Sequence, residues 1–271
     1  MTTRYMMELQ NELENKNREL SETHQHIFSS IRFAGMIQGS LMPDASLLNS
    51  LFAGADFKVI QQIGIGGDSV FIKQTGNNVM FGLFDCTGHG IPGAMLSISG
   101  SLILNELMTR SPQADPEVIV KELSALLFKT FRNDSYSIAH MEGSFFSFST
   151  ETGQLSYCGA RAKGLYMKND GSIMELASGK NALGELPAGE FERFELDYAK
   201  GAKLVLYSDG LTDQFGGDNN KKFTRSRLKK ILVEHAGEDA STLCKTIEGA
   251  HNDWKNNNEQ TDDVSFLVIK F

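Results

Sequence analysis

Four aspartates stand at the ends of apolar, strand-like segments, and their carboxylates are the type of side chain that binds hard divalent cations. Asp85 and Asp209 each directly follow an apolar run. Asp262 comes shortly before another such run, and Asp68 follows a pair of glycines. Magnesium and similar cations are held in proteins by oxygen ligands, above all carboxylates. The pattern, which has no matching set of basic residues, therefore predicts a metal-dependent hydrolase.

The segment around Asp85 carries the strongest signal. It reads Phe-Asp-Cys-Thr-Gly-His-Gly-Ile-Pro-Gly-Ala from residue 84 to residue 94. Its glycines permit a tight turn after the strand, and Pro92 stands where a helix can begin. His89 lies in this turn, and because histidine titrates near neutral pH it is a candidate general acid for a leaving oxygen. The alternative, that His89 only shapes the turn, stays open at this point.

Composition limits the other function classes. Of the 271 residues 41% are hydrophobic and 22% charged, so the chain can bury a substantial core. A net charge of −8 argues against a nucleic-acid partner, which requires a basic surface. The three cysteines have no CxxC spacing and predict neither a disulfide framework nor a zinc site. Because no long apolar run and no signal-peptide core is found, we expect a cytoplasmic protein without membrane contact in this chain.

Residues 1–42 differ from the rest of the chain by an apolar repeat with a period of seven residues. We expect a helical linker here, ended by Pro43, and a second region that runs from residue 43 to residue 271. The facing heptad positions include the polar Asn17 and His24, so a coiled coil would be weak. Two interpretations stay open: a homodimer through this helix, and a solvated helix packed on its own domain. The repeat consists of Met6, Leu13, Leu20, Ile27, Ala34 and Leu41.

From about residue 53 the pattern changes to short apolar or alternating runs, separated by turn signals at hairpin spacing. Two helices, 92–110 and 116–131, are expected after the third run, and two more at 225–235 and 240–255. Consecutive hairpins interrupted by pairs of helices indicate an α+β fold with antiparallel sheets and helices on the outer faces. The expected strands are 57–62, 69–74, 79–84, 144–149, 155–157, 164–168, 191–196, 204–208 and 264–270.

Three motifs together resemble those of the SpoIIE-type bacterial serine/threonine phosphatases, which belong to the metal-dependent type 2C (PPM) protein phosphatases. They are the segment 85–94, the Tyr-Ser-Asp-Gly-Leu-Thr-Asp-Gln-Phe-Gly-Gly segment 207–217 and the Thr-Asp-Asp-Val-Ser segment 261–265. The resemblance extends from about residue 37 to the last residue. It implies a four-layer α-β-β-α sandwich, in which two central antiparallel sheets lie between helix pairs, preceded by the N-terminal helical linker.

The same resemblance implies two Mn²⁺ or Mg²⁺ ions in a cleft at one end of the sandwich. Asp85 would bridge them, and Asp209 and Asp262 would complete the protein ligands of one ion. The backbone carbonyl of Cys86 and, through water, Asp68 would serve the other ion. Two such ions can share an activated water that attacks phosphorus in line, so no covalent phosphoenzyme is needed. The expected catalytic residues are Asp85, Asp209 and His89.

Two segments depart from the family pattern and change the wall around the expected site. Gly67-Asp68 is followed by Ser-Val-Phe, where relatives carry Phe-Tyr-Asp or Phe-Tyr-Trp. A Gly-His-Asn-Pro motif is expected near residue 159, but the segment 159–163 reads Gly-Ala-Arg-Ala-Lys. Arg161 could hold a phosphate with two hydrogen bonds, or it is a surface arginine. Asp263 is expected to orient Asp262 or a metal-bound water rather than to bind a metal itself.

The resulting hypothesis is a phosphatase that acts on phosphoserine or phosphothreonine in bacterial signal transduction. The resemblance implies as substrate a phosphorylated regulatory protein of the STAS-like, anti-sigma-antagonist type, dephosphorylated in a partner switch. A sensor, which could be anchored in a membrane, is expected upstream of residue 1, with this chain as its cytoplasmic output domain. Two alternatives stay open: a catalytically inactive, partner-binding domain of the same fold, and a two-metal hydrolase of small phosphoesters.

Overall fold

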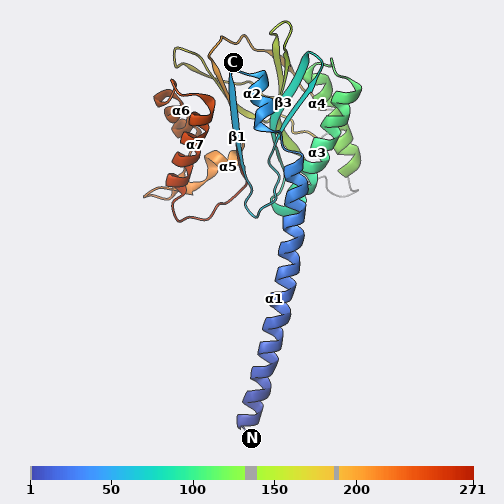
Figure 1. The fold of residues 1–271 in the computed structure, drawn as a ribbon, viewed down its shortest axis with the longest axis vertical. Helices are drawn as coiled ribbons and strands as arrows, with labels where there is room; N and C mark the ends of the chain where they lie inside the picture. The colour runs from blue at the N-terminus through green and yellow to red at the C-terminus, as the bar shows by residue number, and fades with distance from the viewer. Residues whose placement is uncertain (1, 132–138, 186–188) are drawn as a thin grey trace.

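Two five-stranded antiparallel sheets form the centre of the molecule, and helices cover their outer faces (Figure 1). The structure is a computed structural model and describes residues 2–131, 139–185 and 189–271. The first sheet has the strand order β1-β12-β9-β6-β7, and the second has the order β2-β3-β4-β5-β8. This arrangement confirms the predicted α+β sandwich with helices outside two central sheets.

The strands of the first sheet are β1 (Gly54–Ile60), β12 (Val264–Lys270), β9 (Lys203–Tyr207), β6 (Lys163–Met167) and β7 (Ile173–Glu175). Those of the second are β2 (Ser69–Thr75), β3 (Asn78–Cys86), β4 (Met141–Ser149), β5 (Leu155–Ala160) and β8 (Arg193–Glu195). The helices are α1 (Thr2–Ser40), α2 (Ala45–Leu51), α3 (Gly90–Arg110), α4 (Pro116–Phe131), α5 (Asp209–Asp213), α6 (Arg225–Glu234) and α7 (Ala240–Lys255). A short hairpin of β10 (Phe215–Gly216) and β11 (Lys221–Lys222) lies outside both sheets.

Three apolar clusters hold the layers together. The central cluster lies between the sheets and combines side chains of both, such as Phe81 of β3 and Leu267 of β12. A second cluster packs α3 and α4 on the outer face of the second sheet, and a third packs α6 and α7 on that of the first. Strand β3 is covered on both faces, which explains why its sequence is a continuous apolar run rather than an alternating one.

Most elements expected from the sequence coincide with observed ones. Helices α4 and α7 and strand β12 have the predicted bounds, and α3 begins two residues early, at Gly90. Two short helices were not predicted, α5 and α2, the latter capped by Asp44, which accepts a hydrogen bond from the Ser46 amide (2.9 Å). The segment 191–196 yields only the short strand β8, because pairing with β5 is limited to three positions.

Helix α1 extends away from the sandwich along most of its length (Figure 1). Side chains 5–30 are exposed, so over this length α1 does not pack on its own domain. The last turns do contact the sandwich: a Cβ on Gly35 would lie 2.9 Å from the carbonyl oxygen of Gly64, so this glycine allows close packing. The predicted N-terminal helix is confirmed, whereas the domain division at residue 42 stays a prediction.

Among the described residues, α3 is the one helix with the length and hydropathy of a membrane span. Half of this span is buried inside the protein. Its buried side chains, among them Leu104 and Leu107, pack in the same cluster as α4 and the second sheet. Packing within the domain therefore accounts for the apolar character of this helix.

Candidate metal centre

Three of the four predicted aspartates line one cavity of about 200 Å³. Asp85 reaches it from the end of β3 in the second sheet. Asp209 reaches it from the first residue of α5, directly after β9, and Asp262 from the turn before β12, both in the first sheet. The two sheets therefore build the site jointly. The rest of the lining is Cys86, Thr87, Gly88, His89, His140 and Glu142.

The fourth aspartate, Asp68, is buried, with 1% of its surface exposed. Neither of its carboxylate oxygens has a hydrogen-bond partner within the described residues. Burial raises the pKa of Asp68 to about 7, and the nearby hydroxyls of Ser208 and Ser265 oppose this rise only in part. An unpartnered buried carboxylate is costly, and a bound cation would remove that cost.

The carboxyl groups also act on one another. Burial and the negative charges of Asp68, Asp209 and Asp262 raise the pKa of Asp85 to about 10. Glu142 lies opposite Asp85 in the register of β3 and β4, and its pKa is raised mainly by burial. Sequence analysis missed Glu142 because it belongs to no motif, and only the strand pairing places it at the site.

These observations fit divalent cations. In the parts of the chain that the structure describes, no three acidic, His or Cys side chains already stand in a coordination arrangement. A Cβ on Gly67 would lie 2.4 Å from the carbonyl oxygen of Cys86, so only glycine allows the two segments to approach this closely. The groups that would hold the ions are the side chains of Asp68, Asp85, Asp209 and Asp262 and the carbonyl of Cys86.

The loop that carries Asp68 is fixed by Asp263. The carboxylate of Asp263 accepts hydrogen bonds from the backbone amides of Gln62 (2.8 Å) and Gly67 (2.7 Å). Its own amide donates to Oδ1 of Asp262 (2.8 Å). With both oxygens used in this way, Asp263 is placed to position its neighbours, and its role toward a metal stays a prediction.

The same loop is tied to α1 by Gln38, a buried residue for which the sequence predicted no role at the site. Its Nε2 donates hydrogen bonds to the carbonyl of Gly66 (2.6 Å) and to the hydroxyl of Ser97 on α3 (2.7 Å). The amide of Gly66 donates in return to Oε1 of Gln38 (3.3 Å). The sequence offered one signal for this contact: the polar amide of Gln38 lies next to Gly39 and close to Gly35, near the end of a predicted helix.

His89 lies at the start of α3, on the cavity wall, and is exposed. It occupies the N-cap position, yet its side chain makes no capping hydrogen bond. The pKa of Asp262 is raised, mainly by burial, and the nearby ring of His89 is one of the groups that oppose this rise. His89 thus lines the cavity without a capping role, and its role as general acid stays a prediction.

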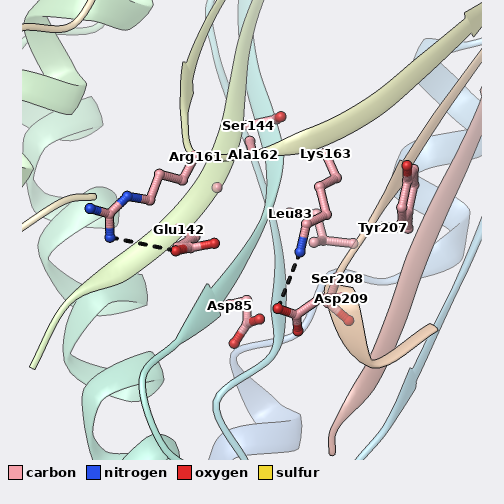
Figure 2. Close-up of a pocket in the computed structure, with 11 residues that line it drawn as sticks. Leu83, Asp85, Glu142, Ser144, Arg161, Ala162, Lys163, Tyr207, Ser208 and Asp209 are labelled. Atoms are coloured by element: carbon pink, nitrogen blue, oxygen red, sulfur yellow. Dashed lines mark ion pairs between the residues drawn. The ribbon is translucent and has the colours of Figure 1, made fainter. Parts of the chain in front are cut away.

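Beside this cavity lies a second hollow, with Arg161 and Lys163 along one wall (Figure 2). Arg161 has a left-handed backbone (φ 50°), and its guanidinium pairs with Glu185 (2.8 Å) and more loosely with Glu142 (3.8 Å). Its Nε donates to the carbonyl of Lys180 (2.8 Å). These contacts occupy much of the guanidinium, so a phosphate bound by Arg161 would have to replace some of them.

The two-sheet sandwich with acidic strand ends defines a phosphatase domain of the metal-dependent PPM class. The sequence model of the family described as Stage II sporulation protein E (SpoIIE) matches residues 75–271. The chain belongs to this family, which confirms the resemblance found in the sequence.

Two curated relatives come from Bacillus subtilis (strain 168). The phosphoserine phosphatase RsbP is 22% identical over 188 residues, which cover 69% of this chain and 44% of RsbP. The phosphoserine phosphatase RsbU is 23% identical over 246 residues, which cover 86% of this chain and 67% of RsbU. The chain thus spans less than half the length of RsbP.

Three solved structures share the fold. The SiaA-PP2C domain of Pseudomonas aeruginosa has a TM-score of 0.83 at 22% identity, over 92% of this chain and 98% of that one. The PP2C phosphatase domain of SpoIIE from Bacillus subtilis, with a fragment of its regulatory domain, has a TM-score of 0.65 at 12% identity, with coverages of 80% and 62%. RsbX in complex with magnesium has a TM-score of 0.57 at 16% identity, with coverages of 80% and 94%.

Proposed function

We propose that this chain is a metal-dependent protein phosphatase that hydrolyses phosphoserine or phosphothreonine on a regulatory protein of the STAS-like type, in a bacterial partner switch. The observation that carries the proposal is the buried carboxylate of Asp68, which lacks a hydrogen-bond partner in the described structure and lies beside Asp85. Asp85 in turn lies close to Asp209 and Asp262. The names of the two curated phosphatases support the reaction class.

Each residue of the site has a separate task in this proposal. Two divalent cations, Mn²⁺ or Mg²⁺, would supply an acidified water and neutralise the phosphoryl oxygens when bound. Asp85 would hold both ions, because its carboxylate lies among those of Asp68, Asp209 and Asp262. His89 would give a proton to the serine or threonine oxygen as it leaves. The magnesium found with RsbX supports the choice of cation.

Two further parts of the proposal concern the protein's surroundings. The exposed heptad face of α1 supports pairing with a second copy of the chain, since Met6, Leu13 and Leu20 would otherwise stay in water. The cysteines are unpaired and buried, which supports the reducing environment of the cytoplasm.

The proposal is tested by phosphate release from a serine-phosphorylated STAS-like protein, measured with Mn²⁺, with Mg²⁺ and in excess EDTA. We expect release with either cation and none in EDTA. Asp209→Asn should lose nearly all activity and remain folded. Asp213→Asn is the matched control, because Asp213 lies on the same short helix but pairs with Lys222 (2.8 Å). Full turnover in EDTA would contradict the proposed chemistry.

The same assay separates the two alternatives. Tight binding of the phosphoprotein without phosphate release would identify an inactive partner-binding domain. Phosphate release from small phosphoesters, together with no release from any phosphoprotein of a panel, would identify a hydrolase of small molecules. Against the inactive form, all four aspartates are present, and three of them line one cavity.

A further inference from the structure

Lys163 brings a positive charge directly to one of the proposed ligands. Its Nζ lies 3.1 Å from Oδ2 of Asp209 (Figure 2). The backbone fixes this proximity: Lys163 begins β6 and pairs in register with Tyr207, two residues before Asp209. The sheet pairing therefore places the backbone of Lys163 beside the segment that leads to Asp209, within reach of its long side chain.

The chemistry of this contact opposes that of a cation site. A cluster of carboxylates attracts divalent ions through its negative charge, and an ammonium group paired with one ligand cancels part of that charge. Lysine carries a compact charge on a flexible stem, so it can also leave the ligand when a stronger cation arrives. The side chains of Lys163 and Asp209 are 36% and 38% exposed, which leaves room for this exchange.

Glu142 is a second acidic group near Lys163 with which the displaced Lys163 ammonium could pair. Glu142 lines the same hollow as Lys163, and the positive charge of Lys163 opposes the burial-driven rise of its pKa. Lys163 thus lies under the influence of two carboxylates, Asp209 and Glu142. A move of the Lys163 ammonium toward Glu142 would free Asp209.

We propose that Lys163 is a built-in competitor for the divalent cation: it pairs with Asp209, must be displaced when the ion binds, and so lowers the affinity of the site. This inference rests on the metal dependence proposed above. It implies that the fraction of sites holding a metal ion rises gradually with cation concentration instead of being complete at trace concentrations. Lys163 would thereby set the cation concentration at which the enzyme binds its metal.

Calorimetric titration with Mn²⁺ tests the inference on the full chain, without any substrate. We expect Lys163→Met to bind Mn²⁺ about three- to tenfold more tightly than the wild type, since a partly exposed ion pair is worth modest energy and a nearby positive charge is also removed. Lys163→Arg keeps the charge and should not tighten binding. High salt should reduce the gain of Lys163→Met, because it screens the interaction.

Lys222→Met is the matched control. Lys222 also pairs with an aspartate, Asp213 at 2.8 Å, and lines a hollow that includes Lys163, but Asp213 is not a proposed ligand. Equal or weaker Mn²⁺ binding by Lys163→Met, confirmed with Lys163→Gln in case the first variant fails to fold, would overturn the inference. Equal tightening by Lys222→Met would also overturn it. Absence of Mn²⁺ binding by the wild type would instead contradict the proposed metal dependence itself.

Discussion

Gln38 on the last turn of α1 donates a hydrogen bond of 2.6 Å to the carbonyl of Gly66, two residues before the buried Asp68. The helix that otherwise points away from the sandwich therefore holds the loop that presents a proposed metal ligand. The hydroxyl of Ser97 joins the same bond network from α3. A change in the position of α1 would reach Asp68 through this amide.

The first prediction concerns this amide. Gln38→Ala leaves the Gly66 carbonyl with the weaker hydroxyl contact of Ser97 (3.2 Å). The backbone amide of Gly66 also loses its hydrogen bond to Oε1 of Gln38. We therefore expect a loss of about 1–2 kcal/mol of unfolding free energy and weaker Mn²⁺ binding. Urea unfolding and calorimetry measure the two effects. Gln10→Ala is the control, since Gln10 lies on the exposed part of α1; equal effects of both changes would contradict the coupling.

The second prediction concerns the leaving group. If His89 donates the proton, His89→Ala should slow the hydrolysis of phosphoserine far more than that of para-nitrophenyl phosphate, whose leaving group needs no proton. Steady-state kcat on the two substrates gives the comparison. Equal losses on both would show that His89 only shapes the turn before α3.

The third prediction concerns stability and pH. Burial lowers the pKa of His251, on α7, to about 4, below the ordinary value of 6.5. As the pH falls, His251 of the unfolded chain is protonated before the buried His251 of the folded protein. The stability that the neutral, buried His251 contributes is therefore complete above pH 6.5 and is lost as the pH falls from there toward 4. At pH 5.5 the loss should reach about 1 kcal/mol, or about 2–4 °C in Tm.

His251→Leu removes this titration. Its Tm should therefore fall less than that of the wild type between pH 7.5 and pH 5.5, as measured by thermal unfolding in chelator. His251 packs against the ring of Phe223 and does not line the cavity that holds the carboxylates. Parallel Tm profiles for the two proteins would show that His251 keeps an ordinary pKa.

The fourth prediction concerns α1. Leu13→Glu together with Leu20→Glu places charges on the exposed apolar seam, so any helix pair should dissociate, and the turnover number should change if pairing moves Gln38. Light scattering and kinetics measure the two effects. Asn11→Glu with Gln25→Glu adds the same charge off the seam and should change neither. An unchanged mass in solution and an unchanged turnover number for the Leu13→Glu, Leu20→Glu variant would show that α1 serves only as a tether.

The sequence predicted the strand ends that carry Asp85, Asp209 and Asp262, because buried strands and Gly-rich turns are local patterns. It could not predict Glu142 or Gln38. Glu142 reaches the site through the pairing of β3 with β4, and Gln38 through contact between α1 and a distant loop. Such positions depend on tertiary packing, which periodicity does not encode.

The short elements were missed for a related reason. Helix α5 has five residues and follows β9 directly, so it has no periodicity of its own. Its start nevertheless fixes the position of Asp209. The seam of α1, by contrast, was visible in the sequence, but only the structure shows that its part from Met6 to Ile27 is exposed, while the last turns contact the domain.

The division of the ligands between the sheets has a mechanical consequence. Asp85 lies in β3 of one sheet, whereas Asp209 follows β9 and Asp262 precedes β12 of the other, so an ion held by all three would cross-link the two sheets. Slow hydrogen exchange in β3 and β9 should then depend on cation in both strands together, since neither sheet can separate while the cross-link persists. The cations would thus stabilise the contact between the two sheets in addition to taking part in the reaction.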